Sequence, residues 1–94
     1  MCTQLKNLNE IIILDSPNLT DDAFEYLSYA IHLKKLKIAN NKNLTDFSIK
    51  SITKSCIELR YISLTDCERI SDSSLKCMSN LRNLCVLNLA DCFR

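Results

Sequence analysis

Apolar residues along this chain follow a spacing that indicates short strands. In the segment 59–75, LRYISLTDCERISDSSL, Leu59, Ile62 and Leu64 are apolar and the residues between them are mostly polar. Apolar positions three and then two apart place their side chains on one face of a bend that leads into a strand. A turn at Cys67 and a helix start at Ser71 follow. The segment therefore predicts a strand, a turn and a helix, in that order.

The same pattern of strand, turn and helix repeats along the sequence. Ile13, Ile38, Leu64 and Leu89 occupy equivalent positions, at separations of 25, 26 and 25 residues. A repeat of about 20 to 29 residues with one strand and one helix is the signature of a leucine-rich repeat. We therefore predict an α/β leucine-rich-repeat solenoid, right-handed, with short parallel strands on a concave face and helices on a convex face. Residues 1–94 form one domain with units 5–29, 30–55, 56–80 and an incomplete 81–94, which gives about 3.5 repeats, four strands and three helices.

Three sets of polar or small residues recur at the turns and helix starts. A side chain at each strand end can hydrogen-bond backbone groups that the turn leaves unpaired, asparagine fully and cysteine weakly; the residues are Ser16, Asn41, Cys67 and Cys92. Threonine or serine is expected to cap each helix, followed by an aspartate that suits the positive helix end; the pairs are Thr20-Asp21, Thr45-Asp46 and Ser71-Asp72. A third set is small and should allow close helix packing: Ala23, Ser48 and Ser74.

Composition narrows the class of partner. The 94 residues include 12 basic and 11 acidic side chains, a formal charge of +1, which gives no global reason to expect nucleic acid or an anionic membrane. The sequence has no apolar run of about 20 residues and no signal-peptide pattern. We therefore expect a cytoplasmic protein with neither nucleic acid nor a membrane as its partner.

Catalytic and metal chemistry find no support in the sequence. None of the six cysteines forms the CxxC spacing of a structural zinc site, and their positions fit reduced, buried thiols; they are Cys2, Cys56, Cys67, Cys77, Cys85 and Cys92. The single histidine, His32, falls in a loop and is expected to be exposed and inert. The serines lack the flanking glycines of a nucleophile elbow. We therefore expect no enzyme activity, cofactor or metal.

Lysines gather in the second unit, at Lys34, Lys35, Lys37 and Lys42. They fit either a solvated face or an electrostatic contact with an acidic protein such as a tubulin-like surface. Nucleic acid is disfavoured because no aromatic stacking platform accompanies the lysines.

Residues between the inward apolar positions should point out of the concave face. We predict a tentative protein-binding surface there because a central tyrosine lies among mixed polar and apolar neighbours; its residues are Glu10, Ile12, Lys35, Lys37, Tyr61, Ser63, Val86 and Asn88. Two further rows are expected beside them: Leu14, Ala39, Thr65 and Ala90, then Asp15, Asn40, Asp66 and Asp91. The alternative is an ordinary surface on a spacer whose contacts lie elsewhere.

The repeated lines DSPNLTDDAF, NNKNLTDFSI, DCERISDSSL and LNLADCFR resemble the cysteine-containing leucine-rich repeats of F-box proteins. KIANNKNLTD and SLTDCERISDSSLK are also similar to repeats of a family member that serves as a subunit of the nexin–dynein regulatory complex of motile cilia. The resemblance implies a protein-interaction scaffold at the ciliary axoneme. It also implies an alternative, the substrate-recognition segment of a cullin-type ubiquitin ligase, although the chain has no F-box and has Ser16 and Asn41 in place of two cysteines.

Solenoids need end units with a polar outer face. The segment 1–4 is too short to cover the first unit, and the fourth strand lacks a helix over Leu81, Leu84, Leu87 and Leu89. We therefore expect a fragment of a longer array that self-associates through its uncovered ends.

Overall fold

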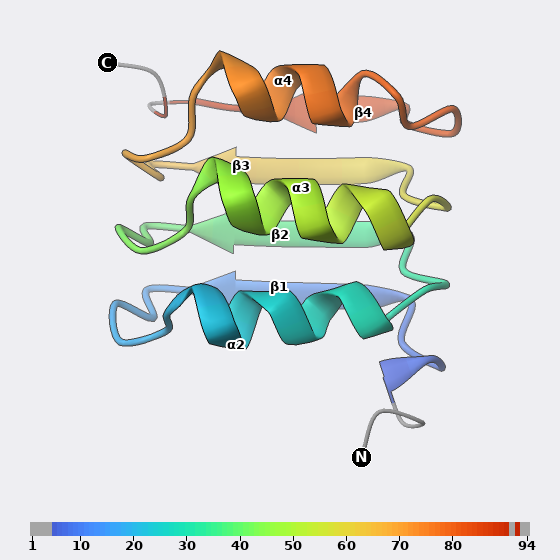
Figure 1. Cartoon of the computed structure of the whole chain (residues 1–94), viewed down its shortest axis with the longest axis horizontal. Helices are drawn as coiled ribbons and strands as arrows, with labels where there is room; N and C mark the ends of the chain where they lie inside the picture. The colour runs from blue at the N-terminus through green and yellow to red at the C-terminus, as the bar shows by residue number, and fades with distance from the viewer. Residues whose placement is uncertain (1–4, 91, 93–94) are drawn as a thin grey trace.

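A computed structural model of the chain describes residues 5–90 and 92. The elements follow in the order β1 (Glu10–Leu14), α2 (Asp21–Tyr26), the 3₁₀ helix η1 (Leu27–Tyr29), β2 (Lys35–Ala39), α3 (Asp46–Ser55), β3 (Tyr61–Thr65), α4 (Asp72–Met78) and β4 (Val86–Asn88). The strands form a single parallel sheet in the order β1-β2-β3-β4 (Figure 1). The prediction of an α/β fold with four parallel strands and three α-helices is confirmed for the described residues.

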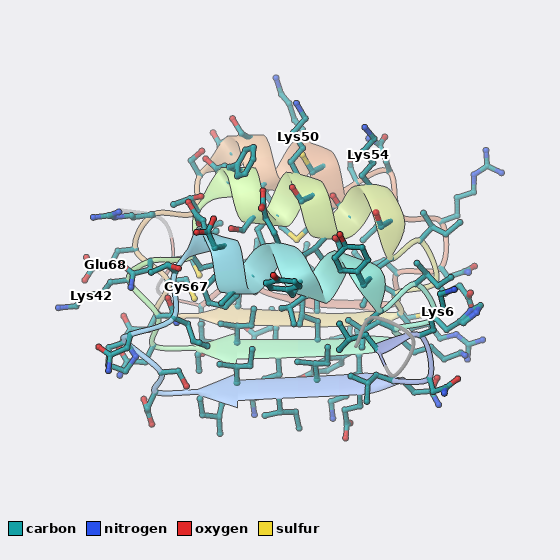
Figure 2. All side chains as sticks on the ribbon, turned by 60° about the horizontal axis from the view of Figure 1, so that its bottom comes forward. Lys6, Lys42, Lys50, Lys54, Cys67 and Glu68 are labelled. Atoms are coloured by element: carbon teal, nitrogen blue, oxygen red, sulfur yellow. The ribbon has the colours of Figure 1, made fainter. Side chains whose placement is uncertain are left out.

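The helices all cover the same face of the sheet (Figure 1, Figure 2). Strands β1, β2 and β3 each run into a turn and then a helix, and α3 packs between α2 and α4. A parallel connection needs a crossover of this kind because the chain must return to the same end of the sheet before the next strand starts. We call a strand with the turn and helix after it a level. The face of the sheet opposite the helices is the outward face.

Equivalent residues of successive levels pair across the sheet. Ile13 is opposite Ile38, and Ile38 is opposite Leu64, which is the register that separations of 25 and 26 residues require. The backbone pairing extends past the strands, since Asp15 N–H donates to Ala39 C=O at 3.1 Å and Asn40 N–H donates to Thr65 C=O at 2.9 Å. Neighbouring levels are therefore joined along the whole strand and its first turn residue.

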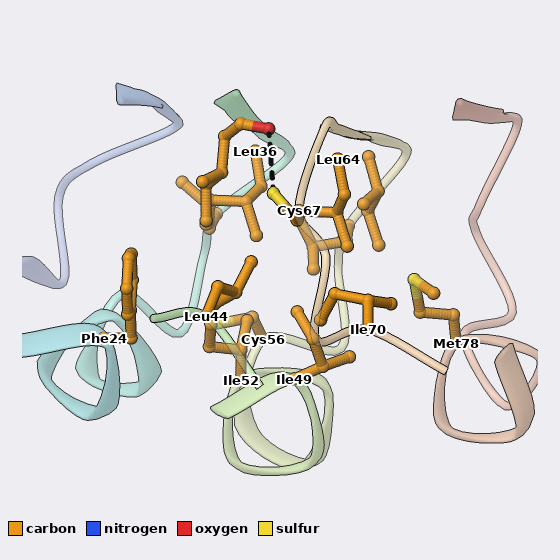
Figure 3. Close-up of a cluster of buried hydrophobic side chains, with 14 of the residues drawn as sticks. Phe24, Leu36, Leu44, Ile49, Ile52, Cys56, Leu64, Cys67, Ile70 and Met78 are labelled. Carbon is orange, nitrogen blue, oxygen red and sulfur yellow. Dashed lines mark hydrogen bonds between the residues drawn. The ribbon is translucent and has the colours of Figure 1, made fainter. Parts of the chain in front are cut away.

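The core lies between the sheet and the helices (Figure 3). Strands β2 and β3 contribute Leu36, Ile38, Ile62 and Leu64, each no more than 1% exposed. The helices and turns supply the opposing side chains, including Phe24, Leu44, Ile49, Ile52, Ile70 and Met78. Every level contributes to one shared apolar layer, as the inward positions of the repeated pattern predict.

Burial falls off in the two outer strands. Ile11 and Ile13 of β1 are half-buried, and Leu87 of β4 is 40% exposed. Leu81 departs from the sequence prediction of poor cover, since only 7% of its surface is exposed. It lies three residues after the end of α4 and joins the core before the chain reaches β4. The predicted lack of cover over the first unit by residues 1–4 lies outside the described residues.

Three residues at the strand ends adopt the left-handed backbone conformation. They are Asp15, Asn40 and Asp66, with φ of 52°, 55° and 55°. Asparagine and aspartate visit this region more readily than other side chains, apart from glycine, and this chain contains no glycine. The polar column that the sequence predicted to face outward therefore has a conformational role. Its fourth member, Asp91, lies outside the described residues.

The residue after each of these turns satisfies the backbone as predicted. Asn41 is fully buried; its side-chain amide donates to Ser16 C=O at 2.7 Å and its oxygen accepts from the N–H groups of Asn43 and Leu44. At the equivalent position the Cys67 thiol is a weak donor, 3.4 Å from Thr65 C=O and 3.8 Å from Ile38 C=O (Figure 3). Asparagine thus makes the stronger set of bonds.

The predicted helix caps are only partly correct. Thr20, Thr45 and Ser71 occupy the N-cap positions, but only the Ser71 hydroxyl accepts a bond from its own helix, from Ser73 N–H at 3.3 Å. Thr45 instead donates to Asp21 of the level before it, 3.1 Å away.

The aspartates at the helix starts bind the following level. Ser48, fully buried, donates to Asp21 at 2.7 Å. One level further on, Asp46 accepts from the Ser71 N–H at 2.9 Å and from the hydroxyls of Ser71 and Ser74. The small serines therefore join adjacent levels through hydrogen bonds as well as allowing close packing.

Candidate functional site: the outward face of the sheet

The residues predicted to bind a partner come together in two rows across the outward face. Strand pairing aligns Glu10, Lys35, Tyr61 and Val86 in the first row. It aligns Ile12, Lys37, Ser63 and Asn88 in the second. Side chains alternate between the two faces of a strand, and the residues between these positions are those that form the core.

Exposure differs along the rows. Ile12 and Val86 are 48% and 47% exposed, while Lys35, Lys37 and Tyr61 are half-buried. Ser63 contradicts its predicted place in an accessible surface, since it is only 2% exposed. Its small side chain is flanked by Lys37 and Asn88 across the sheet and by Tyr61 and Thr65 along its strand. These larger neighbours cover it.

An electrostatic chain crosses the first row. The Lys35 ammonium lies 3.2 Å from a Glu10 carboxylate oxygen and 5.0 Å from the centroid of the Tyr61 ring. The first contact is an ion pair and the second a cation–π interaction. Sequence reasoning placed these residues in one row but did not find the contacts, which depend on side-chain conformations. These two contacts hold three side chains from three strands together in one continuous patch.

A third row adds an apolar end to this surface. Leu14, opposite Ala39 and then Thr65, is 50% exposed and lies two residues beyond Ile12 on β1. The sequence predicted that this row faces outward, but the predicted protein-binding surface did not include it. The outward face thus offers apolar area on β1, positive charge on β2 and an aromatic ring on β3.

The lysines predicted to form a basic cluster are dispersed. Lys34 lies 3.8 Å from Glu58, and Lys35 pairs with Glu10. Lys42 lies in the turn after β2, beyond the carboxyl end of the strand (Figure 2). Glu58 and Glu10, which lie 24 and 25 residues away from Lys34 and Lys35 in the sequence, partly neutralise these two lysines. Of the four, Lys37 lies within the two rows and forms no ion pair with the described residues.

His32 is exposed, as predicted, but it makes one polar contact. Its Nδ1–H donates to Glu58 at 2.7 Å, and 55% of its side chain remains exposed. This hydrogen bond is the main cause that lowers the pKa of Glu58 below its ordinary value of 4.5. The pair joins the loops that precede β2 and β3. It forms a third electrostatic link between adjacent levels.

The described cysteines are free thiols with mixed exposure. Cys56, Cys67 and Cys92 are buried, Cys77 is half-buried and Cys85 is exposed, so the prediction of buried thiols is wrong for Cys85. Burial raises the pKa of Cys56 and of Cys67 to about 11, which keeps both protonated at neutral pH and so poorly nucleophilic. Cys2 lies outside the described residues. Among residues 5–90 and 92, no three His, Cys, Asp or Glu side chains are grouped to hold a metal ion.

No protein-family model matches this sequence. None of the helices in the described part of the chain combines the length and the apolar composition needed to cross a membrane.

Proposed function

We propose that the chain is a leucine-rich-repeat solenoid that acts as a non-catalytic protein–protein interaction scaffold, in the cytoplasm and at the ciliary axoneme. The repeat of 25 or 26 residues supports the solenoid assignment, as do the parallel strands in sequence order and the helices gathered on one face. In this arrangement the outward face is the concave surface, and the partner binds there.

The observation that carries the binding proposal is the composition of that surface. Exposed Ile12 and Leu14 adjoin the ordered Lys35–Tyr61 pair, so apolar, charged and aromatic groups lie within three neighbouring strands. Tyrosine is among the side chains that contribute most of the energy of typical protein interfaces, and the contacts around such an anchor exclude water. Two adjacent exposed aliphatic side chains on a water-facing strand are better suited to cover by a partner than to hydration.

The resemblance of the repeats supports the choice of partner. KIANNKNLTD, SLTDCERISDSSLK and LNLADCFR are similar to one region of F-box/LRR-repeat protein 13, a leucine-rich-repeat subunit of the nexin–dynein regulatory complex. On this basis the partner is an axonemal protein, and the scaffold helps to tether dynein regulation to the axoneme. The alternative is the substrate-recognition segment of a cullin-type ubiquitin ligase, which the resemblance to F-box proteins favours.

Affinity capture of the protein that contains this sequence from ciliated cells, followed by mass spectrometry, distinguishes the two. We expect subunits of the axonemal regulatory complex without cullin. Recovery of the ligase adaptor and a cullin, with no axonemal proteins, would replace the proposal with its alternative. Recovery of neither class would reject both.

A further inference from the structure

A second surface lies on the helix side of the molecule, between the first and second levels. It is an open groove of about 500 Å³, lined by Asp22, Glu25, Tyr26, Ser28, Tyr29 and Ser51. Ser51 comes from α3, and the other residues come from α2 and η1. The volume falls within the range of about 300 to 1,000 Å³ that is usual for ligand sites. The groove is separated from the outward face by the sheet and the core.

Two tyrosine rings give the groove its shape. The centroids of Tyr26 and Tyr29 lie 6.2 Å apart with 39° between the ring planes. The two residues are 50% and 49% exposed, so about half of each large side chain remains in water. The face of an aromatic ring is negative and attracts a cation placed over it. Neither ring is needed to fill the core, which Phe24 of α2 occupies.

Negative charge is concentrated along the same segment. Asp21, Asp22 and Glu25 lie in α2 and the segment 21–29 has no basic residue, although the whole chain has a charge of +1. Asp21 accepts hydrogen bonds from Thr45 and Ser48, whereas Asp22 and Glu25 line the groove.

The other two helices lack this combination. α3 carries Lys54 in its last turn and α4 carries Lys76, while α2 and η1 have no basic residue there. The carbonyl end of a helix is the negative end of its dipole, and a lysine there is a favourable neighbour that the first level does not provide. Carboxylates, ring faces and the helix end therefore all favour a cation in this groove.

We propose that this groove binds an arginine side chain from a basic segment of a partner protein. A guanidinium is planar, so it can stack on a tyrosine ring while its N–H groups reach a carboxylate. A lysine ammonium is a more strongly hydrated point charge and cannot pair with a carboxylate in the same bidentate way. The groove and the outward face lie on opposite sides of the sheet, so the scaffold can hold two partners at once. This inference does not depend on what binds the outward face.

The test is an NMR titration of the ¹⁵N-labelled chain with an acetylated peptide of alternating arginine and serine. The matched control peptide carries citrulline, an uncharged analogue of nearly the same shape, in place of each arginine. We expect chemical-shift changes at Tyr26, Tyr29 and Ser51 with the arginine peptide, and none at these residues with the citrulline peptide. Equal binding of both peptides, or changes confined to other parts of the chain, would overturn the proposal.

Variants sharpen the assignment. Removal of both groove carboxylates, Asp22→Asn with Glu25→Gln, should weaken binding of the arginine peptide about tenfold, since each exposed charge pair is worth up to about 1 kcal/mol. Asp72→Asn removes an exposed carboxylate of α4, which does not line the groove, and should leave the affinity unchanged. Equal losses in the two variants would mean that the peptide responds to overall charge and would contradict a groove site. If the double variant does not fold, the comparison of the two peptides on the unaltered chain still decides.

Discussion

The middle strands of the sheet and its outer strands have the same pattern of apolar residues, but they bury these side chains to different extents. Leu36, Ile62 and Leu87 occupy the same row of the sheet, on β2, β3 and β4. Leu36 and Ile62 are each 1% exposed, whereas Leu87 is 40% exposed. On the other side, Ile11 of β1 pairs with Leu36 and is half-buried.

This difference shows that a level cannot bury its own apolar face. Strand β2 has β1 and β3 beside it and lies under the layer of helices, which covers one face of the sheet, while β4 has one neighbouring strand among the described residues. The stability of such a stack comes from intrinsic terms of each level and from interfaces between adjacent levels. The same residue type should therefore contribute more in the middle than in an outer strand.

The largest expected effect comes from a matched pair of leucine truncations. Leu36→Ala should lower the free energy of unfolding by about 2 to 5 kcal/mol, because it removes a buried side chain and leaves a cavity. Leu87→Ala should cost about 1 kcal/mol or less, because part of that side chain is already in water. Urea denaturation of both variants measures the difference. Equal losses would contradict the contrast between middle and outer strands.

The strand-end column allows a second comparison within the middle levels. Asn41→Cys places in the second level the residue that the third has at Cys67, and it removes the two bonds that the Asn41 oxygen accepts. The N–H groups of Asn43 and Leu44 then lack that acceptor, which should cost about 1 to 3 kcal/mol. Thermal and urea unfolding measure the loss. Asn18→Cys, at an exposed position in the turn after β1, is the control and should change stability little. An equally small effect at Asn41 would mean that its hydrogen bonds make no net contribution to stability.

Asp46 and Asp72 start successive helices, but only Asp46 has the described hydroxyls of a following level beside it. Burial alone would raise the pKa of Asp46, but hydrogen bonds from Ser71 and Ser74 outweigh it and hold the pKa below its ordinary value of 3.8. A carboxylate with a lowered folded-state pKa contributes stability that is present above about pH 4 and is lost as the pH falls through that folded-state value.

Asp46→Asn should therefore destabilise the chain at neutral pH by about 1 kcal/mol, a value reduced for exposure to solvent. As the pH falls from neutral through the lowered folded-state pKa of Asp46, the difference from the unaltered chain should shrink and disappear, since both side chains are then uncharged. Urea midpoints measured across this pH range give the profile, with Asp72→Asn as the matched variant of the last helix. A loss at Asp46 that does not depend on pH would mean that the carboxylate charge is not what joins the levels.

The smallest effect is expected for the ion pair at the first strand. Glu10→Gln removes the partner of Lys35, but both side chains are substantially exposed, at 53% and 40%. Exposed pairs are worth about 0 to 1 kcal/mol, so the unfolding midpoint should hardly move and should respond weakly to salt. A loss as large as that of Leu36→Ala would show that the outward face, and not the core, stabilises the chain.

The strand ladder could be predicted because it depends only on spacing along the chain. The period of 25 or 26 residues aligned Ile13, Ile38 and Leu64, and the structure pairs these residues. The left-handed turns at Asp15, Asn40 and Asp66 could also have been predicted from the sequence. A chain without glycine must place asparagine or aspartate where a positive φ is needed.

Contacts between levels could not be predicted from local rules. The N-cap preference of threonine was correctly recognised, but the Thr45 hydroxyl bonds Asp21, 24 residues earlier, and not its own helix. The burial of Ser63 depends on larger side chains from neighbouring strands, and the dispersal of the lysines depends on Glu10 and Glu58. In each case the deciding partner is one level away, where sequence position gives the alignment but not the side-chain conformation.

The binding proposal is tested most directly by the affinity of the captured partner for two matched double variants. Tyr61→Ala with Lys37→Glu alters the outward face, while Phe47→Ala with Lys50→Glu makes the same kinds of change on the exposed side of α3 (Figure 2). We expect the first to weaken binding at least about tenfold without unfolding the chain, because a central aromatic anchor contributes about 1 to 2 kcal/mol or more. The second should bind as the unaltered chain does. Unchanged binding by the first variant and loss by the second would place the interface on the helices and contradict the proposal.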